Sequence, residues 1–161
     1  MQKRLDYSSA APGSIQAMYK LEKFVKDSGL EESLVDLVRT RVSQINGCAY
    51  CIDMHTKDAR ARGETEQRLY ALSAWRETPF FTERERAALA WAETTTLVSQ
   101  THVPDADYEA AREHFDEGEL VKLTMAVIAI NGWNRLAISF REIPGEYVST
   151  VGTGAAASTP T

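Results

Sequence analysis

Residues 46–55 decide the interpretation of this chain, and they read Asn46-Gly47-Cys48-Ala49-Tyr50-Cys51-Ile52-Asp53-Met54-His55. The stretch contains both cysteines and one of the three histidines. Gly47 is a natural helix stop, because glycine accepts the left-handed conformation of a C-cap. No Gly or Pro follows before Gly63, so we predict a new helix from Cys48 to about Arg62. Two thiols with a nearby imidazole make redox chemistry the first hypothesis.

The spacing places the three reactive side chains on one face of the predicted helix. Cys48, Cys51 and His55 stand at i, i+3 and i+7, which corresponds to an arc of roughly 60°. Cys48 would lie in the first turn, where unpaired backbone N–H groups favour a thiolate. His55 lies four residues after Cys51, so the imidazole can accept a thiol proton. Spacing alone leaves open which cysteine attacks a substrate.

The preceding segment supplies a carboxylate. Residues 36–45 have the apolar pattern of a helix, and a turn at Asn46-Gly47 would fold this helix back along the cysteine helix. Counting outward from the turn brings Asp36 opposite about residue 57, within roughly one helical turn of His55. We therefore expect Asp36 to orient His55. The alternative is that Asp36 is an ordinary solvated helix residue.

Three segments resemble a known family. The central run 37–59, together with 83–89 and 130–135, is similar to the carboxymuconolactone decarboxylase superfamily, and most similar to its alkylhydroperoxidase-D-like branch. The likeness covers roughly residues 15–145. It implies an all-α, compact multi-helix domain, a homo-oligomer, and thiol-dependent reduction of organic hydroperoxides. An external dithiol would return the enzyme to its reduced form, without a cofactor or a metal.

The resemblance also implies roles for individual residues. Cys51 would attack the peroxide, Cys48 would resolve the sulfenic acid as a disulfide, and His55 and Asp36 would form a proton relay. Two positions depart from the family. Asp36 stands where the family usually has Glu, and Tyr50 stands where the characterised peroxidase has a further relay histidine. Members that decarboxylate a lactone typically lack the C-x-x-C pair, so that chemistry is not expected here.

Two other classes of function fit the same residues. The first is a general dithiol–disulfide redox adaptor with no preference for peroxide. The second is a non-enzymatic helical binding module, in which the thiols are inert or hold a metal. Only three candidate metal ligands are local to the motif, whereas structural zinc normally takes four. Buried cysteines are common in any class of protein.

Composition excludes several partners. The chain has 161 residues, a formal net charge of −5 and a pI near 5.3, so nucleic-acid binding has little electrostatic support. No apolar stretch approaches the roughly 20 residues that span a bilayer. The first residues are polar and lack the apolar core of a signal peptide. We therefore expect a cytoplasmic protein, where a C-x-x-C pair is more often catalytic or metal-binding than structural.

Helix signals cover most of the remaining chain, and no strand-like alternation or internal repeat stands out. We expect one domain over residues 1–150 and a flexible tail over 151–161. Residues 1–13 are expected to be extended. Besides the cysteine helix, the predicted helices are approximately 14–28, 31–46, 64–75, 82–99, 105–115 and 119–141.

A few other side chains attract attention. His102 and His114 are expected in loops or on the surface. Trp91 and Trp133 are expected in the core or an interface, with substrate-pocket lining as the alternative. The last helix is apolar over most of its circumference, so its polar residues need partners if they are buried. A neighbouring subunit is one place where such partners can lie. These polar residues are Asn131, Asn134 and Arg135.

Overall fold

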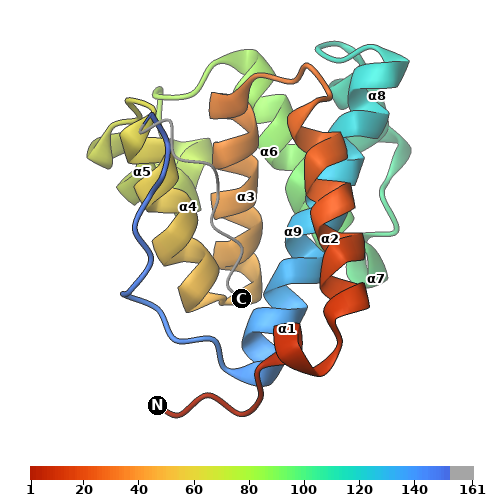
Figure 1. Cartoon of the computed structure of the whole chain (residues 1–161). Helices are drawn as coiled ribbons and strands as arrows, with labels where there is room; N and C mark the ends of the chain where they lie inside the picture. Colours follow the sequence, from red (N-terminus) through yellow and green to blue (C-terminus); the bar gives the residue numbers. More distant parts are fainter. Residues whose placement is uncertain (153–161) are drawn as a thin grey trace.

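The computed structural model describes residues 1–152, and within them every regular element is helical, as the sequence predicts. The long helices lie alongside one another and α4 flanks α3 (Figure 1). The α-helices are α1 Tyr7–Ala10, α2 Pro12–Lys26, α3 Glu32–Asn46, α4 Ala49–Ala61, α5 Glu66–Ala71, α6 Glu83–Thr96, α7 Val98–Thr101, α8 Asp105–Arg112 and α9 Glu117–Phe140, and a 3₁₀-helix, η1, covers Leu72–Glu77.

The hairpin of α3 and α4 has the predicted form. Gly47 adopts the left-handed conformation, with φ of 69°, and the Cys48 N–H donates to the Ser43 carbonyl oxygen at 2.9 Å. These contacts satisfy carbonyl groups at the end of α3 and reverse the chain within two residues. The turn therefore holds α4 against α3, with the cysteines at the start of α4.

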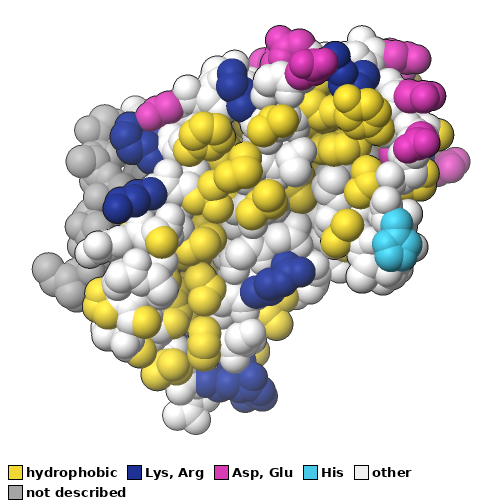
Figure 2. Space-filling view, turned by 90° about the vertical axis from the view of Figure 1, so that its right-hand side faces the viewer, with side chains coloured by type: hydrophobic (Ala, Val, Ile, Leu, Met, Phe, Trp, Pro, Cys, Tyr) yellow, Lys and Arg dark blue, Asp and Glu magenta, His cyan; other side chains and the backbone are white. Residues whose placement is uncertain are grey.

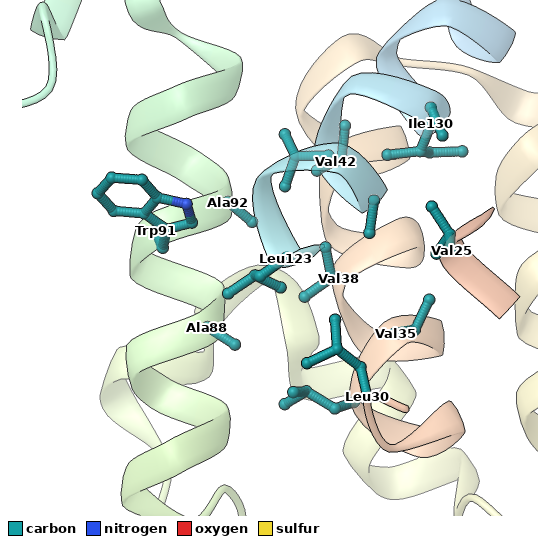
Figure 3. Packing of buried hydrophobic residues seen from close by; sticks show 14 of the residues in the cluster. Val25, Leu30, Val35, Val38, Val42, Ala88, Trp91, Ala92, Leu123 and Ile130 are labelled. Carbon is teal, nitrogen blue, oxygen red and sulfur yellow. The ribbon is translucent and has the colours of Figure 1, made fainter. Parts of the chain in front are cut away.

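The core lies where α3, α6 and α9 meet (Figure 3). Val38 and Val42 of α3, Ala88 of α6, and Leu123 and Ile130 of α9 are almost fully buried. The small side chain of Ala88 lets these helices approach closely. The apolar pattern that predicted the helices therefore also identifies the faces that pack together.

The predicted bounds are wrong at the N-terminus. Residues 7–10 form the short helix α1, which Asp6 caps by accepting from the Ser8 and Ser9 N–H groups. Pro12 occupies the first turn of α2, where its missing N–H costs nothing, instead of breaking the chain. The capping box predicted at Thr82 is confirmed. Of the predicted tail 151–161, residues 153–161 lie outside the described residues.

One face of the molecule carries many apolar side chains. Exposed hydrophobic residues include Val121 and Ile128 of α9 and Tyr108 of α8. Figure 2 views the side of the molecule on which α8 lies and shows hydrophobic side chains gathered across it. Helix α9 is thus only partly buried within one chain. No helix in the described part of the chain is long and apolar enough to cross a membrane.

Candidate active site

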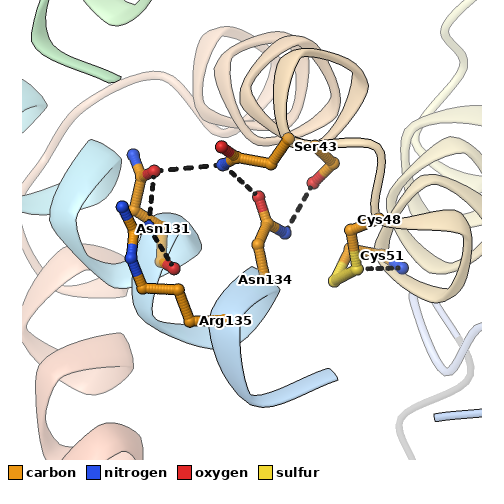
Figure 4. The surroundings of a disulfide bond; sticks show 7 residues. Ser43, Cys48, Cys51, Asn131, Asn134 and Arg135 are labelled. Carbon is orange, nitrogen blue, oxygen red and sulfur yellow. Dashed lines mark hydrogen bonds between the residues drawn. A yellow bond between two sulfur atoms is a disulfide. The ribbon is translucent and has the colours of Figure 1, made fainter. Parts of the chain in front are cut away.

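Cys48 and Cys51 are joined by a disulfide at the start of α4 (Figure 4). Cys48 is the N-cap residue, and its sulfur accepts a hydrogen bond from the Cys51 N–H at 3.3 Å. The two Cα atoms are 5.4 Å apart, within the usual range for a disulfide. Each residue is only 1% exposed. The predicted helix start therefore places both sulfurs together, at the positive end of the helix dipole.

Cys51 and His55 line the same cavity, which has a volume of about 330 Å³. Helices α1, α2, α3 and α9 provide the remaining walls, so the cavity exists only in the folded chain. Aromatic rings dominate those walls, and charged side chains lie among them. Besides Cys51 and His55, the lining residues are Tyr7, Tyr19, Glu22, Arg39, Tyr50, Met54, Asp58, Trp133 and Ala137.

The imidazole of His55 is buried, with 6% of the residue exposed. Neither ring nitrogen has a hydrogen-bond partner among residues 1–152. Burial lowers the pKa of His55 to about 3, and the positive charges of Arg39 and Arg62 act in the same direction. At neutral pH the ring is therefore uncharged and keeps a free lone pair inside the cavity.

Asp36 is also buried, with 3% of the residue exposed, so it is not a solvated helix residue. Its Oδ2 accepts a hydrogen bond from Arg62 Nη1 at 2.7 Å. Burial raises the pKa of Asp36 to about 6, although the Arg62 guanidinium opposes that shift. Within the described residues, no hydrogen bond joins this carboxylate to His55. The predicted relay partner is thus paired with Arg62 and not with the imidazole.

Three charged residues of the cavity, Glu22, Arg39 and Asp58, escaped the sequence reasoning. Arg39 of α3 forms an ion pair with Glu22 of α2, and the other Glu22 oxygen accepts from Trp133 Nε1 at 2.9 Å. Glu22 and Arg39 also line a neighbouring cavity of about 400 Å³, which Asp36 lines. Arg39 lies one turn after Asp36 on the same helix, so spacing could have found it. No signal in the sequence pointed to Glu22.

A polar network fixes the end of α3 next to the disulfide (Figure 4). Asn46 Nδ2 donates to the side-chain oxygens of Asn131 and Asn134, at 3.0 and 2.8 Å. Asn134 is fully buried and donates in turn to Ser43 Oγ. Asn131 also accepts from Arg135. These polar residues find partners within their own chain, so a neighbouring subunit is not needed to provide them.

The other singled-out residues lie as follows. His102 is exposed in the loop after α7, and His114 is half-buried. Trp91 belongs to the core and donates to Thr124 Oγ1. Trp133 lines the Cys51 cavity. In the part of the chain that the structure describes, no group of three or more His, Cys, Asp or Glu side chains is arranged to hold a metal ion.

The chain is similar to proteins of a known family. The family model described as carboxymuconolactone decarboxylase matches residues 12–94, which is more than half of the chain. The chain belongs to the carboxymuconolactone decarboxylase family, and within it to the alkylhydroperoxidase-D-like branch. The resemblance noted in the sequence is therefore confirmed.

Individual relatives match three quarters or more of the chain. YdfG of Bacillus subtilis, an uncharacterized protein, is 46% identical over 139 residues, or 86% of this chain and 95% of YdfG. YnjA of Escherichia coli, also uncharacterized, is 31% identical over 121 residues, or 75% of this chain and 65% of YnjA. A crystal structure from Agrobacterium tumefaciens has a TM-score of 0.87 and 44% identity, covering 89% of this chain and 99% of that chain. Its protein is of unknown function, with a suggested role in antioxidant defence as an AhpD protein.

Proposed function

We propose that this protein is a thiol-dependent peroxidase that reduces organic hydroperoxides through the Cys48–Cys51 dithiol/disulfide cycle. The observation that carries the proposal is the shared cavity of Cys51 and His55. That cavity places a reducible sulfur, a neutral imidazole and aromatic walls around one space. Such a space suits an apolar substrate with a polar reactive end.

The cycle follows from the chemistry of the two sulfurs. In the reduced protein His55 takes the proton of the Cys51 thiol and forms an ion pair with the thiolate, whose negative charge opposes the effect of burial on the His55 pKa. The thiolate attacks the O–O bond of the hydroperoxide. The bond breaks, Cys51 becomes a sulfenic acid, and the leaving alkoxide takes up a proton and departs as an alcohol. The Cys48 thiol then displaces hydroxide from Cys51, so water and the observed disulfide form. Two electrons from an external dithiol restore both thiols.

The surroundings of Cys51 support a thiolate. Cys51 lies in the first turn of α4, where free N–H groups and the helix dipole favour negative charge. Arg39 lines the same cavity, where its guanidinium forms an ion pair with Glu22. The proposal therefore assigns attack to Cys51 rather than to Cys48, which lines a different hollow.

A dithiothreitol-supported hydroperoxide assay tests the proposal. Wild type should consume cumene hydroperoxide catalytically. Cys51→Ser should abolish turnover, and Cys48→Ser should allow a single turnover that leaves a sulfenic acid on Cys51, which dimedone would trap. Single-turnover reaction in Cys51→Ser but not in Cys48→Ser would reverse the two roles. No consumption by wild type would refute the peroxidase proposal.

One observation favours the redox adaptor as a second candidate. Asp36 is paired with Arg62 instead of His55, which leaves the imidazole without the carboxylate that a relay uses. Comparing the rates with cumene hydroperoxide and with a small disulfide substrate separates the two functions. Asp36→Glu tests the relay directly, because the added methylene extends the carboxylate. Faster peroxide turnover in this variant, with disulfide exchange unchanged, would support the peroxidase.

The proposal includes self-association and a reducing compartment. The exposed apolar side chains of α8 and α9, such as Tyr108 and Val121, would be covered in a homo-oligomer. Cycling requires a supply of external dithiol, which the cytoplasm provides. Sedimentation of wild type and Val121→Lys tests the assembly. A monomeric wild type would remove self-association from the proposal without affecting the peroxidase assay.

A further inference from the structure

The two cysteines of the disulfide line different hollows. Cys51 lines the aromatic cavity that also holds His55. Cys48 lines a smaller hollow of about 170 Å³, between the start of α4 and the end of α9. We call this second space the Cys48 hollow. Its lining residues are Met1, Gly47, Cys48, Ala49, Tyr50, Ala137, Ile138, Arg141 and Glu142.

Tyr50 and Ala137 stand between the two spaces, since they line both. The electrostatic surroundings of Tyr50 agree with that position. Burial raises the pKa of Tyr50, and Glu142 of the Cys48 hollow and Tyr19 of the Cys51 cavity raise it further. A phenol ring thus separates two approaches to one disulfide. Tyr50 is also one of the two positions at which this sequence departs from the family pattern.

We infer that the external reductant attacks Cys48 through the Cys48 hollow, while the hydroperoxide reaches Cys51 through the aromatic cavity. Thiol–disulfide exchange requires a thiolate to approach the attacked sulfur on the side away from the leaving sulfur. For Cys48 that approach need not pass through the cavity that Cys51 and His55 line. The inference rests on the proposed function only for the identity of the oxidant.

The thiol–disulfide exchange takes two steps, and in each step one S–S bond forms as another breaks. A thiolate of the external dithiol bonds to Cys48 Sγ, the Cys48–Cys51 bond breaks, and the Cys51 sulfur leaves as a thiolate beside His55. The second thiol of the reductant then loses its proton and displaces Cys48 as a thiolate, closing a disulfide within the reductant. Because the hollow is small, a compact dithiol fits it. Product alcohol can leave the aromatic cavity independently of this reduction.

Trapping the mixed disulfide tests which sulfur is attacked. The protein is oxidised with diamide, which needs no peroxidase activity, and is then mixed with excess 2-mercaptoethanol. Acid quenching, alkylation and fragmentation of the peptide that holds both cysteines locate the adduct. We expect 2-mercaptoethanol on Cys48 and the alkyl group on Cys51. The reverse assignment would overturn the inference, and either result stands whether or not the protein reduces peroxides.

Variants that fill one space at a time provide the second test. Ile138 is 44% exposed, so Ile138→Trp should narrow the Cys48 hollow without disturbing the core. We expect reduction by dithiothreitol to slow at least tenfold, while oxidation by cumene hydroperoxide keeps its wild-type rate. Met54→Trp, which fills the other cavity, should show the opposite pattern.

Ala74→Trp is the matched control, because it adds the same ring at an exposed position of η1, which lines neither space. Both half-reactions should keep their wild-type rates in this variant. The inference fails if Ile138→Trp is reduced as fast as wild type, or if Met54→Trp slows reduction as much as Ile138→Trp does. If no variant reacts with peroxide but the reduction rates still differ as expected, only the peroxidase proposal fails.

Discussion

Replacing His55 with glutamine should remove much of the acid sensitivity of the oxidised protein. His55 is buried, uncharged at neutral pH and without a hydrogen-bond partner among the described residues. Its pKa is lowered from 6.5 to about 3, mainly by burial. An unfolded chain has no such burial, so the imidazole there takes up a proton near its ordinary pKa. At pH values between the two pKa values, the unfolded chain therefore binds one more proton at His55 than the folded chain does.

The sign and size follow from linkage. Between pH 6.5 and about 3 the unfolded chain binds a proton at His55 that the folded chain does not. The contribution of neutral His55 to the free energy of unfolding is therefore fully present above pH 6.5 and is lost as the pH falls through this range. The whole shift is worth about 5 kcal/mol, since one pKa unit corresponds to about 1.4 kcal/mol. Roughly 2 kcal/mol of it should be lost between pH 7 and pH 5, and roughly 3 kcal/mol between pH 7 and pH 4.

Urea unfolding at pH 7, 5 and 4 measures this loss for the oxidised wild type and His55→Gln. Asp36 has a raised pKa and acts in the opposite direction between about pH 6 and pH 3.8, but both proteins contain Asp36. The difference between them therefore isolates His55. His102→Gln is the matched control, because His102 is exposed, and it should keep the wild-type pH dependence.

Equal losses of stability in wild type and His55→Gln would refute the reasoning. That result would mean that the folded protein accepts the His55 proton without penalty, through water or a rearranged Asp36. The folded-state pKa of His55 would then lie near its ordinary value, and the ring would be a stronger base toward the Cys51 thiol than its burial implies.

Three further predictions concern the supports of the site. Arg62→Met should destabilise the protein by roughly 2 kcal/mol at pH 7 by leaving the Asp36 carboxylate unpaired, and by less at pH 4, where Asp36 is protonated; equal urea midpoints for wild type and Arg62→Met at pH 7 would contradict this. Asn134→Ala should lower the free energy of unfolding by about 2 kcal/mol, because Asn46 and Ser43 lose a buried partner. A loss below roughly 0.5 kcal/mol in urea unfolding, the size of an ordinary surface substitution, would show that the network contributes little. Gly47→Ala should cost about 1 kcal/mol through its positive φ, Gly47→Asn should cost less, and thermal unfolding should rank them in that order.

The sequence by itself indicated the helical fold, the family, the closeness of Cys48 to Cys51 and the position of His55 one turn after Cys51. These three residues are neighbours on one helix, and helical geometry relates them without reference to the rest of the chain. The Gly47 turn was also local, since only a left-handed residue closes α3 in that way. The prediction that α3 and α4 pair followed from the same turn.

Only the tertiary structure decided what surrounds that group. It paired Asp36 with Arg62, placed Glu22 beside Arg39, and found partners for Asn134 within the chain. Each outcome depends on how far a side chain reaches between helices that are distant in sequence. Periodicity identifies the buried face of a helix. It does not identify which other helix packs against that face, or which residues along the two helices come into contact. Contacts within one turn are therefore readable from the sequence, whereas contacts between helices depend on packing.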